Sequence, residues 1–368
     1  MTIEKLNHDG HGSESPRQDK GVLDVTVVLV QGDYASTAIG PIEVFQSTGV
    51  LWNVLHGDEP QPRFRVQVAS IDGDSVVSPS SLEFAPKLSI RDIAHTDIII
   101  IPASGLDIPS CVARSAALLP WLREWYARGA YIAGVCTGVA LIAEAGLLDG
   151  RQATTHWAVA NQLRQRYPNV LWRPELFVTE DRRLLCSGGV YASIDLSLYL
   201  VEKFCSHETA LQCAKALLVS MPRSRQSGYS VLPLSRPHAD EKIRTAEEYL
   251  QKHYNLDVSI KVLADKVGMG PRNFIRRFKA ATGYLPGAYS QMLRVAAAKE
   301  LLESGAPSIQ NVCTRIGYGD VGYFRSLFKR HTGMTPAEYR SQFAHMSMER
   351  GDLPRGQEEE EQYARRAS

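Results

Sequence analysis

The 368-residue sequence has little net charge, few cysteines and no long apolar run. Its 41 Lys and Arg residues nearly balance 40 Asp and Glu residues, which leaves a formal charge of +1. Apolar windows are of strand length, well short of the ~18 residues of a membrane-spanning helix. Six irregularly scattered cysteines fit a reducing cytoplasm better than a disulfide framework or a zinc site. Residues 1–20 lack the apolar core of a signal peptide. These absences predict a cytoplasmic protein with no membrane partner, no metal and no cofactor.

The balanced total conceals an uneven distribution of charge. Residues 239–345 contain 16 Lys and Arg against 10 Asp and Glu, an excess of +6, so the rest of the chain is acidic. A basic C-terminal third on an acidic remainder favours a nucleic-acid-binding module joined to another domain, although a solvated basic face is the alternative. The length also suits two domains, or three.

Residues 21–219 alternate short apolar runs with helical patterns. Strands are expected at 22–30, 64–71, 97–102 and 130–135, and helices at 110–128 and 137–145. This alternation predicts an α/β domain with a mostly parallel sheet covered on both faces.

The remaining segments differ in composition. Residues 1–20 and the acidic segment 346–368 lack apolar periodicity, and we expect both to be disordered tails. Residues 220–238 contain three prolines and little periodicity, which predicts an interdomain linker. Residues 239–345 carry only helical patterns, which predicts an all-α domain.

The all-α segment contains an internal repeat. Seven identities occur at an offset of 50 residues, including Phe274 with Phe324 and Gly283 with Gly333. Upstream, two apolar helix faces repeat at an offset of 49, each preceded by a capping serine, Ser259 or Ser308. A short helix, a glycine turn and a second helix form a helix-turn-helix, and here the unit occurs twice. Duplication for packing alone is the alternative.

The second helix of each unit is the expected major-groove reader. Basic and polar side chains away from the phenylalanine face are Arg272, Arg276, Arg277 and Lys279 in the first unit, and Tyr323, Arg325, Lys329 and Arg330 in the second. A helix over 287–304 would join the units and span ~27 Å at 1.5 Å per residue. Since successive major grooves on one side of DNA lie ~34 Å apart, one chain is expected to bridge two of them.

The segment Phe328–Arg340 resembles the C-terminal signature of AraC/XylS-type transcription regulators, and the likeness spans residues 240–343. The resemblance implies double-stranded DNA as a partner. It also implies base-contacting positions at Arg272, Ile275 and Arg276 in the first helix and at Gly322, Tyr323, Arg325 and Ser326 in the second.

Residues 134–138 read Gly-Val-Cys-Thr-Gly between an expected strand and an expected helix. Such an elbow exposes its central side chain and directs helix N-terminal amides at it, which favours a Cys136 thiolate. His156, twenty residues on, could sit beside it. One interpretation is a Cys–His active site, and the other is a pocket that only binds a ligand.

The stretch Ala133–Trp157 resembles the ThiJ/PfpI branch of the class I glutamine-amidotransferase-like fold, with a flavodoxin-like sheet. In related enzymes a carboxylate precedes the Gly-Pro stretch where Thr37 stands here, and PfpI-type peptidases have His where this chain has Thr137. These departures predict no enzyme activity and leave Cys136 and His156 as vestigial candidates. A cysteine-dependent amidase or hydratase-like enzyme with a DNA-binding appendage is the alternative.

The two resemblances together match GlxA-type regulators. They imply a transcription regulator, expected to be an activator of a catabolic operon, that responds to a small nitrogenous metabolite. RNA polymerase and a second copy of the chain are further expected partners. We expect the effector to contact Thr37, Ser104, Cys136, Thr137, His156 and Trp157, with Trp52 and Trp157 available to stack on a cationic amine. Non-specific DNA compaction is a third hypothesis.

Overall fold

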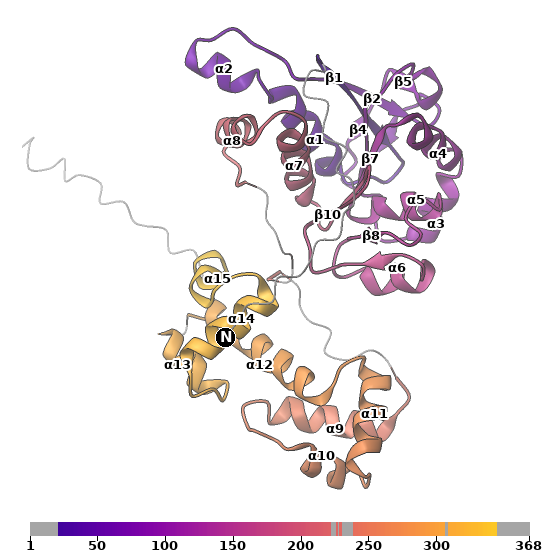
Figure 1. Cartoon of the computed structure of the whole chain (residues 1–368). Coiled ribbons are helices and arrows are strands. Elements are labelled where there is room, and N and C mark those ends of the chain that lie inside the picture. Colours follow the sequence, from indigo (N-terminus) through magenta and orange to yellow (C-terminus); the bar gives the residue numbers. More distant parts are fainter. Residues whose placement is uncertain (1–20, 222–225, 227, 230–237, 306–307, 344–368) are drawn as a thin grey trace, which may run out of the picture. The chain divides into compact units, whose positions relative to one another are not determined.

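The computed structural model describes residues 21–221, 226, 228–229, 238–305 and 308–343. It divides into two compact units, residues 1–230 and 231–368 (Figure 1). The predicted tails lie outside the described residues, as does most of the predicted linker 220–238. Each unit is described below by itself.

The N-terminal unit is built on a seven-stranded sheet of order β10-β11-β7-β6-β1-β2-β5. Its strands are β1 (Leu23–Leu29), β2 (Phe64–Ser70), β5 (Leu88–Ser89), β6 (Ile98–Ile101), β7 (Tyr131–Val135), β10 (Val178–Asp181) and β11 (Leu184–Ser187). All neighbours pair in parallel except β10 with β11. The mostly parallel sheet that the sequence predicts is therefore confirmed, and its four expected strands are β1, β2, β6 and β7.

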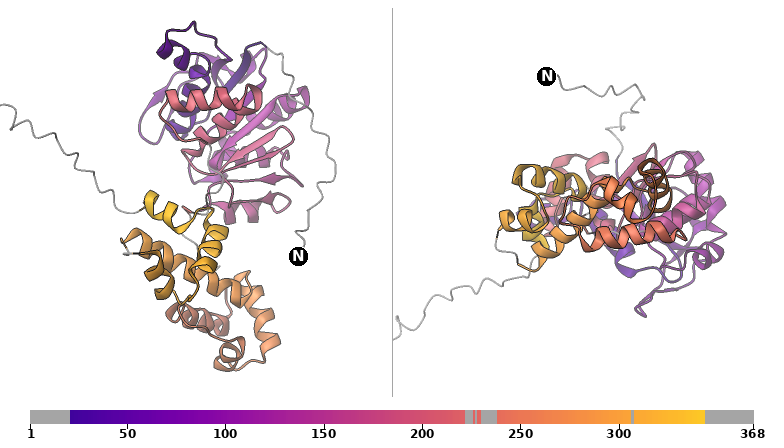
Figure 2. Two further views of the ribbon diagram at one scale, coloured as in Figure 1. Left: turned by 60° about the vertical axis from the view of Figure 1, so that its left-hand side comes forward. Right: turned by 90° about the horizontal axis from the view of Figure 1, so that it is seen from below.

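Helices cover both faces of this sheet, which is why its central strands are apolar on both sides (Figure 2). One face packs on α1 (Ala35–Ser47), α7 (Ala192–Phe204) and α8 (His207–Ala216), with α2 (Leu51–His56) against α8. The other face packs on α3 (Ile108–Arg114), α4 (Leu118–Arg128), α5 (Val139–Glu144) and α6 (Ala160–Arg166). Two-residue strands form two further ladders, β3 (Val76–Val77) with β4 (Glu83–Phe84) and β8 (Gln152–Ala153) with β9 (Leu171–Trp172).

Two expected helices differ in detail from the prediction. The helix expected at 110–128 is interrupted after Arg114 and resumes at Leu118. Pro120 explains the break, because its ring would clash with the carbonyl of residue 116 inside a continuous helix but is tolerated in a first turn. The helix expected at 137–145 begins as a 3₁₀ turn, η2 (Cys136–Gly138), and continues as α5. A second 3₁₀ turn, η1 (Ile90–Asp92), follows β5.

The C-terminal unit contains only helices among its described residues. They are α9 (Glu241–Lys252), α10 (Ile260–Lys266), α11 (Pro271–Thr282), α12 (Pro286–Glu303), α13 (Ile309–Arg315), α14 (Val321–Thr332) and α15 (Pro336–Phe343). Two apolar cores form, one around Phe274 and Phe278 and one around Phe324 and Phe328, and α12 contributes to both. The two repeated units of the sequence are thus two separately packed helix-turn-helix units joined by α12.

The capping residues confirm the expected helix starts. Ser259 accepts a hydrogen bond from the Val262 amide at the start of α10, and Ser308 accepts one from the Asn311 amide at the start of α13. Pro271 occupies the first position of α11, where its missing amide hydrogen has no cost to the helix.

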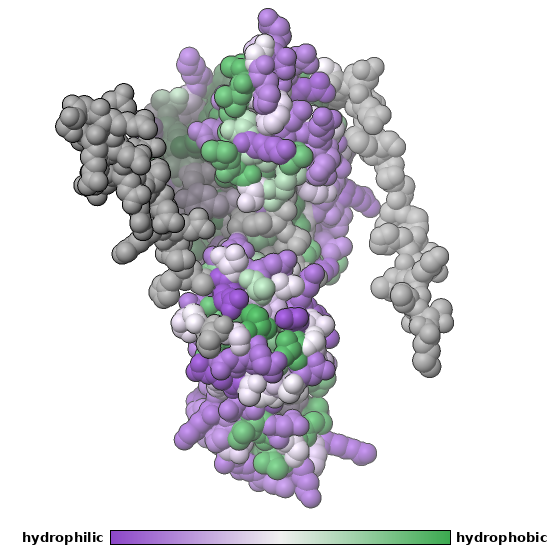
Figure 3. Space-filling view, turned by 90° about the vertical axis from the view of Figure 1, so that its left-hand side faces the viewer, coloured by the Kyte–Doolittle hydropathy of each residue, from purple (hydrophilic) through white to green (hydrophobic). Residues whose placement is uncertain are grey.

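No helix in the described part of the chain is long and apolar enough to cross a membrane. On the face shown in Figure 3, hydrophilic residues surround small, separate hydrophobic patches.

Candidate DNA-binding helices and elbow site

Helix α11 presents a basic, solvent-exposed face. Phe274 and Phe278 are fully buried, so the positions between them point outward. Arg272, Arg276 and Lys279 are exposed, whereas Ile275 is half-buried. The Arg276 guanidinium lies 2.8 Å from the Asn273 side-chain oxygen one turn earlier, which orients it along the helix surface. A cationic face with an oriented arginine is suited to the major groove.

Helix α14 repeats the arrangement. Phe324, Leu327 and Phe328 are buried, and the predicted contact residues all lie on the exposed remainder of the helix: Gly322, Tyr323, Arg325, Ser326, Lys329 and Arg330. Asp320 caps the helix by accepting hydrogen bonds from the amides of Gly322 and Tyr323, at 2.7 and 3.0 Å. Because these amides are satisfied by the cap, the exposed side chains along the helix are the groups left to contact a partner.

Arg277 is the exception among the predicted DNA contacts. Its guanidinium pairs bidentately with Asp240 at the start of α9, at 2.9 and 2.8 Å. Burial raises the pKa of Asp240, but Arg277 and the Ile243 amide outweigh it, so the net shift is downward. The sequence pattern placed Arg277 with the basic face, yet the structure places it as the anchor of α9 on α11.

Two contacts set the spacing of the helix-turn-helix units. Arg294 of α12 is 9% exposed, and its guanidinium donates to the carbonyls of Tyr254 at 2.8 Å and Leu256 at 2.9 Å, both in the first unit. The same guanidinium lies 4.7 Å from the Tyr318 ring centre, in the turn of the second unit. Gly317 has φ +84°, and a Cβ there would lie 1.9 Å from the Asn255 carbonyl oxygen, so the turn of the second unit approaches the α9–α10 connection backbone to backbone.

The elbow predicted at residues 134–138 is present. Cys136 has φ +53°, which is a strained conformation for a residue with a Cβ and is typical of a nucleophile elbow. Gly138 is required next to it, because a Cβ there would lie 2.1 Å from the Pro102 carbonyl oxygen. The elbow follows β7, at the carboxyl ends of the parallel strands.

The Cys136 thiol is buried and protonated. Only 6% of the residue is exposed, and burial raises its pKa to about 11 in spite of hydrogen bonds from the backbone amides of Thr137 and His156. Residue 156 thus reaches the sulfur through its amide. The α5 dipole, which favours a thiolate in principle, is outweighed by desolvation here.

One nitrogen of the His156 ring is already engaged by a backbone amide. Its Nδ1 accepts a hydrogen bond from the Ala158 amide at 3.1 Å, and burial lowers its pKa, so the ring is neutral near pH 7. It lies against the Trp157 ring with a centroid distance of 5.2 Å. Trp52, in contrast, stacks on His56 within α2, just before the amino end of β2 and at the opposite end of the sheet from the elbow. Trp52 and Trp157 therefore do not form a shared aromatic site.

The other predicted effector residues are gathered beside the elbow and buried. The Thr37 hydroxyl donates to the Tyr34 carbonyl and accepts from the Ala103 amide at 3.0 Å. The Thr137 hydroxyl accepts from the Ser104 amide at 3.1 Å. These bonds tie together the segments that follow β1, β6 and β7, so the hydroxyls fix their relative positions beside the elbow.

Asp33 was not predicted, although it follows β1 at the same end of the sheet. It is 2% exposed, and one carboxylate oxygen accepts from the Val30 amide at 2.7 Å while the other has no hydrogen-bond partner. Burial raises its pKa well above the usual value. The sequence signal that could have identified Asp33 is its position as a polar residue just after a buried strand.

A cluster of two aspartates and a histidine lies at the amino ends of β1 and β6. Ligand atoms of Asp24, His95 and Asp97 lie within 4.8 Å of one another. Arg65 already pairs bidentately with Asp24, at 2.5 and 2.7 Å, which neutralises that carboxylate. The cluster is therefore explained as a strand-end ion-pair network.

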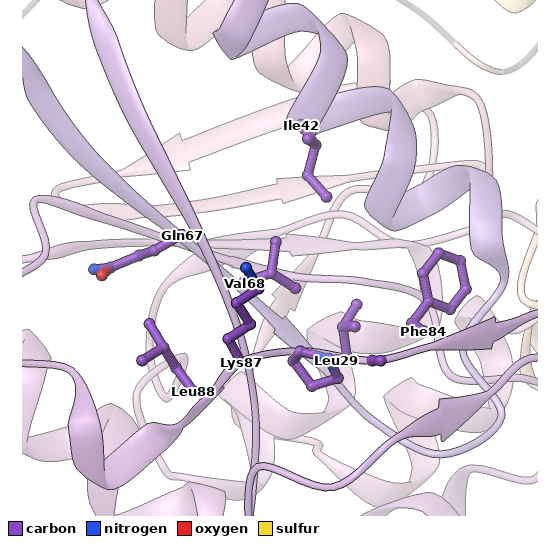
Figure 4. Close-up of a pocket in the computed structure, with 9 residues that line it drawn as sticks. Leu29, Ile42, Gln67, Val68, Phe84, Lys87 and Leu88 are labelled. Atoms are coloured by element: carbon purple, nitrogen blue, oxygen red, sulfur yellow. The ribbon is translucent and has the colours of Figure 1, made fainter.

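A groove with a volume of about 410 Å³ begins beside Leu29, the last residue of β1. It is lined by side chains of α1, β2, β4 and β5, and Figure 4 shows Ile42, Val68 and Phe84 around it. None of the predicted effector residues lines this groove.

Comparison with known protein families agrees with this geometry. Residues 25–203 match the DJ-1/PfpI family, and residues 263–342 match a helix-turn-helix domain family. The first match covers the sheet and the elbow, and the second covers both phenylalanine cores from α10 to α15.

Among curated relatives, the chain is 26% identical over 290 residues to the HTH-type transcriptional regulator CdhR of Pseudomonas aeruginosa, covering 78% of this chain and 84% of the relative. It is 27% identical over 300 residues to the HTH-type transcriptional regulator GlxA of Rhizobium meliloti, covering 78% and 87%. Its N-terminal part is 31% identical over 150 residues to an isonitrile hydratase of Pseudomonas putida, covering 40% of this chain and 63% of that enzyme.

Proposed function

Because this chain is an AraC-family helix-turn-helix transcription regulator with an N-terminal DJ-1/PfpI domain, we propose that it binds one promoter region specifically and responds there to a small metabolite. The effector would be nitrogenous, the controlled genes catabolic, and the protein a cytoplasmic activator. The single observation that carries the proposal is the repetition of one exposed polar face on α11 and α14, each backed by an identical phenylalanine pair.

Direct base readout is assigned first to Arg276 and Arg325. Both are exposed, and the structure gives neither an acidic partner among the described residues. A bidentate arginine contact with guanine contributes about 1–3 kcal/mol of discrimination. Lys279, Lys329 and Arg330 are placed nearer the helix C-termini and are assigned to phosphate contacts, which add affinity without sequence information.

The effector is proposed to bind at the elbow crevice. His156 and Trp157 are half-buried and offer the exposed rim, while Thr37, Ser104, Cys136 and Thr137 form the buried floor. Ligands of open parallel sheets bind beyond the carboxyl ends of strands, and the segments that follow β1, β6 and β7 bring these residues together there. Homodimerisation and contact with RNA polymerase are part of the proposal as family expectations.

The test is a footprint on the DNA upstream of the protein's own gene, with random DNA as competitor. We expect Arg276→Ala to weaken binding to the protected site by about 1–3 kcal/mol while binding to random DNA changes little. Lys252→Ala, which removes one positive charge from α9, is the matched control. Equal loss on both DNAs would assign Arg276 to phosphate, and similar affinity for every duplex in wild type would support non-specific compaction instead.

A cysteine-dependent enzyme is the second candidate function, favoured by the likeness to the isonitrile hydratase and by the strained elbow at Cys136. The protonated thiol and the engagement of the His156 Nδ1 by the Ala158 amide argue against it. Cys136→Ser separates the two functions. Turnover of an amide or nitrile that this variant abolishes, with DNA binding intact, would establish the enzyme; an altered inducer response without turnover supports the sensor.

A further inference from the structure

One side chain from the segment between the two units is buried in the N-terminal unit. Gln226 is 2% exposed, and three acceptors share the two N–H groups of its side-chain nitrogen: the Thr155 carbonyl at 2.7 Å, the Leu176 carbonyl at 3.1 Å and the Thr154 hydroxyl at 3.2 Å. Its side-chain oxygen accepts from the Trp157 amide at 3.4 Å. All four polar contacts agree on which end of the carboxamide is nitrogen.

The backbone around this side chain is shaped to receive it. A Cβ on Gly188 would lie 2.6 Å from the Gln226 side-chain nitrogen and 2.7 Å from its carbonyl carbon. Gly188 does not have a positive φ, and the three atoms nearest to the position of an added Cβ all belong to the Gln226 carboxamide. The Gln226 amide also donates to the Glu175 carbonyl at 3.0 Å, and Tyr229 packs edge-on against Phe177 at 5.5 Å. The slot is therefore a built site rather than a chance surface contact.

The donor and acceptor pattern of the slot selects one chemical class. Two backbone carbonyls and a hydroxyl surround the nitrogen, which would also suit an ammonium group. The Trp157 amide on the other side requires an acceptor, which an ammonium lacks. A primary carboxamide satisfies both sides, and leaving them empty would strand buried polar groups.

The slot shares its wall with the elbow. The Thr155 hydroxyl donates to the Cys136 carbonyl at 2.8 Å, while the Thr155 carbonyl holds Gln226. Two residues further on, the Trp157 amide contacts Gln226. Thr155 thus joins the slot to the elbow directly, which gives a route by which displacement of Gln226 can reach Cys136.

We propose that this slot is a carboxamide-binding site whose resident occupant is Gln226, and that a free primary carboxamide displaces Gln226 and thereby changes the affinity of the protein for DNA. The inference rests on the proposed function, because it assigns a ligand class and a route of regulation to the same sensor. It goes beyond that function because Gln226 of the chain itself would compete with the effector for the slot.

The first experiment is chemical rescue of the full chain by acetamide, which replaces the atoms that Gln226→Ala removes. We expect the variant to melt at a lower temperature than wild type, and acetamide to restore part of the loss saturably. N,N-dimethylacetamide, which has no N–H to donate, should not rescue. Gly188→Ala combined with Gln226→Ala should abolish the rescue, since the methyl fills the slot. If acetamide stabilises Gln226→Ala no more than wild type, the slot assignment is overturned.

The second experiment measures coupling on the same upstream DNA. Gln226→Ala and Gly188→Ala should shift the dissociation constant several-fold in the same direction as saturating acetamide shifts that of wild type, and acetamide should add no further shift in either variant. Gly189→Ala is the matched control, because its Cβ would meet the His156 ring at an ordinary 3.8 Å. Unchanged affinity in both slot variants would overturn the coupling. Failure of wild type to bind this DNA would contradict the proposed function, while the rescue still tests the slot.

Discussion

At the residue scale, burial decides what each ionisable side chain can do. Cys136 sits at a strained elbow with two amides aimed at its sulfur, yet desolvation raises its pKa to about 11. Lys299 of α12 is 7% exposed, and burial lowers its pKa to about 8, against a smaller opposing effect of Glu303. In both cases the effect of lost hydration on the pKa is larger than the opposing effect of nearby groups that favour the charged form.

The Cys136 pKa predicts a slowly reacting thiol. The shift from 9.0 to about 11 lowers the thiolate fraction at pH 8 by roughly 100-fold relative to an unperturbed cysteine. Alkylation of Cys136 by iodoacetamide, followed by peptide mass spectrometry, should be slower in the folded protein by at least that order. The same peptide in urea is the control. Labelling at the unfolded rate would contradict a buried thiol.

The Lys299 pKa predicts the sign of a pH dependence. Between about 8 and 10.5 the unfolded chain binds more protons than the folded one at this residue, so its effect on stability becomes more favourable as pH rises through that window. Below pH 8 the cost of burying the charge is fully present. We expect Lys299→Met to be more stable than wild type at pH 7, with the difference shrinking towards pH 10 in urea unfolding. A constant difference would contradict the shift.

At the scale of elements, α12 acts as a spacer that is fixed at both units. The Arg294 guanidinium donates to two carbonyls of the first unit and lies against the Tyr318 ring of the second. Gly317 lets the turn of the second unit approach the backbone at Asn255. The 18 residues of α12 set the distance between α11 and α14, and these contacts set their relative rotation.

Arg294→Lys is expected to loosen this arrangement. Lysine cannot reproduce the fork to two carbonyls, and a buried acceptor that loses its donor costs about 1–3 kcal/mol. Stability should fall by that order, and affinity for the full operator should fall more than affinity for a half-site. Arg315→Lys, at an exposed position of α13, is the control for stability. Equal loss on full and half operators would show that spacing is not the cause.

At the scale of the whole molecule, the chain consists of two compact units, each with cores of its own. Such units are expected to fold separately. The +6 charge excess of residues 239–345 supplies a salt-dependent attraction to DNA that the acidic remainder does not share.

A fragment of residues 238–345 should therefore bind the upstream DNA by itself, with affinity that falls steeply as salt rises and with no response to any effector. Mobility shifts against random competitor, with circular dichroism to show that the fragment is helical, would measure this. A folded fragment that ignores this DNA would contradict the regulator function.

The sequence by itself determined the parts that depend on local pattern. Period-2 and period-3.6 spacing located the strands, the elbow and both helix-turn-helix units, and duplicated phenylalanines identified the faces of α11 and α14, because periodicity and capping act within a few residues. Only the tertiary structure decided the rest. Arg277 is held by Asp240, 37 residues away, and Gln226 is received by Thr155, 71 residues away. Partner choice and desolvation arise from chain segments that meet only on folding, and no local pattern encodes which of them will meet.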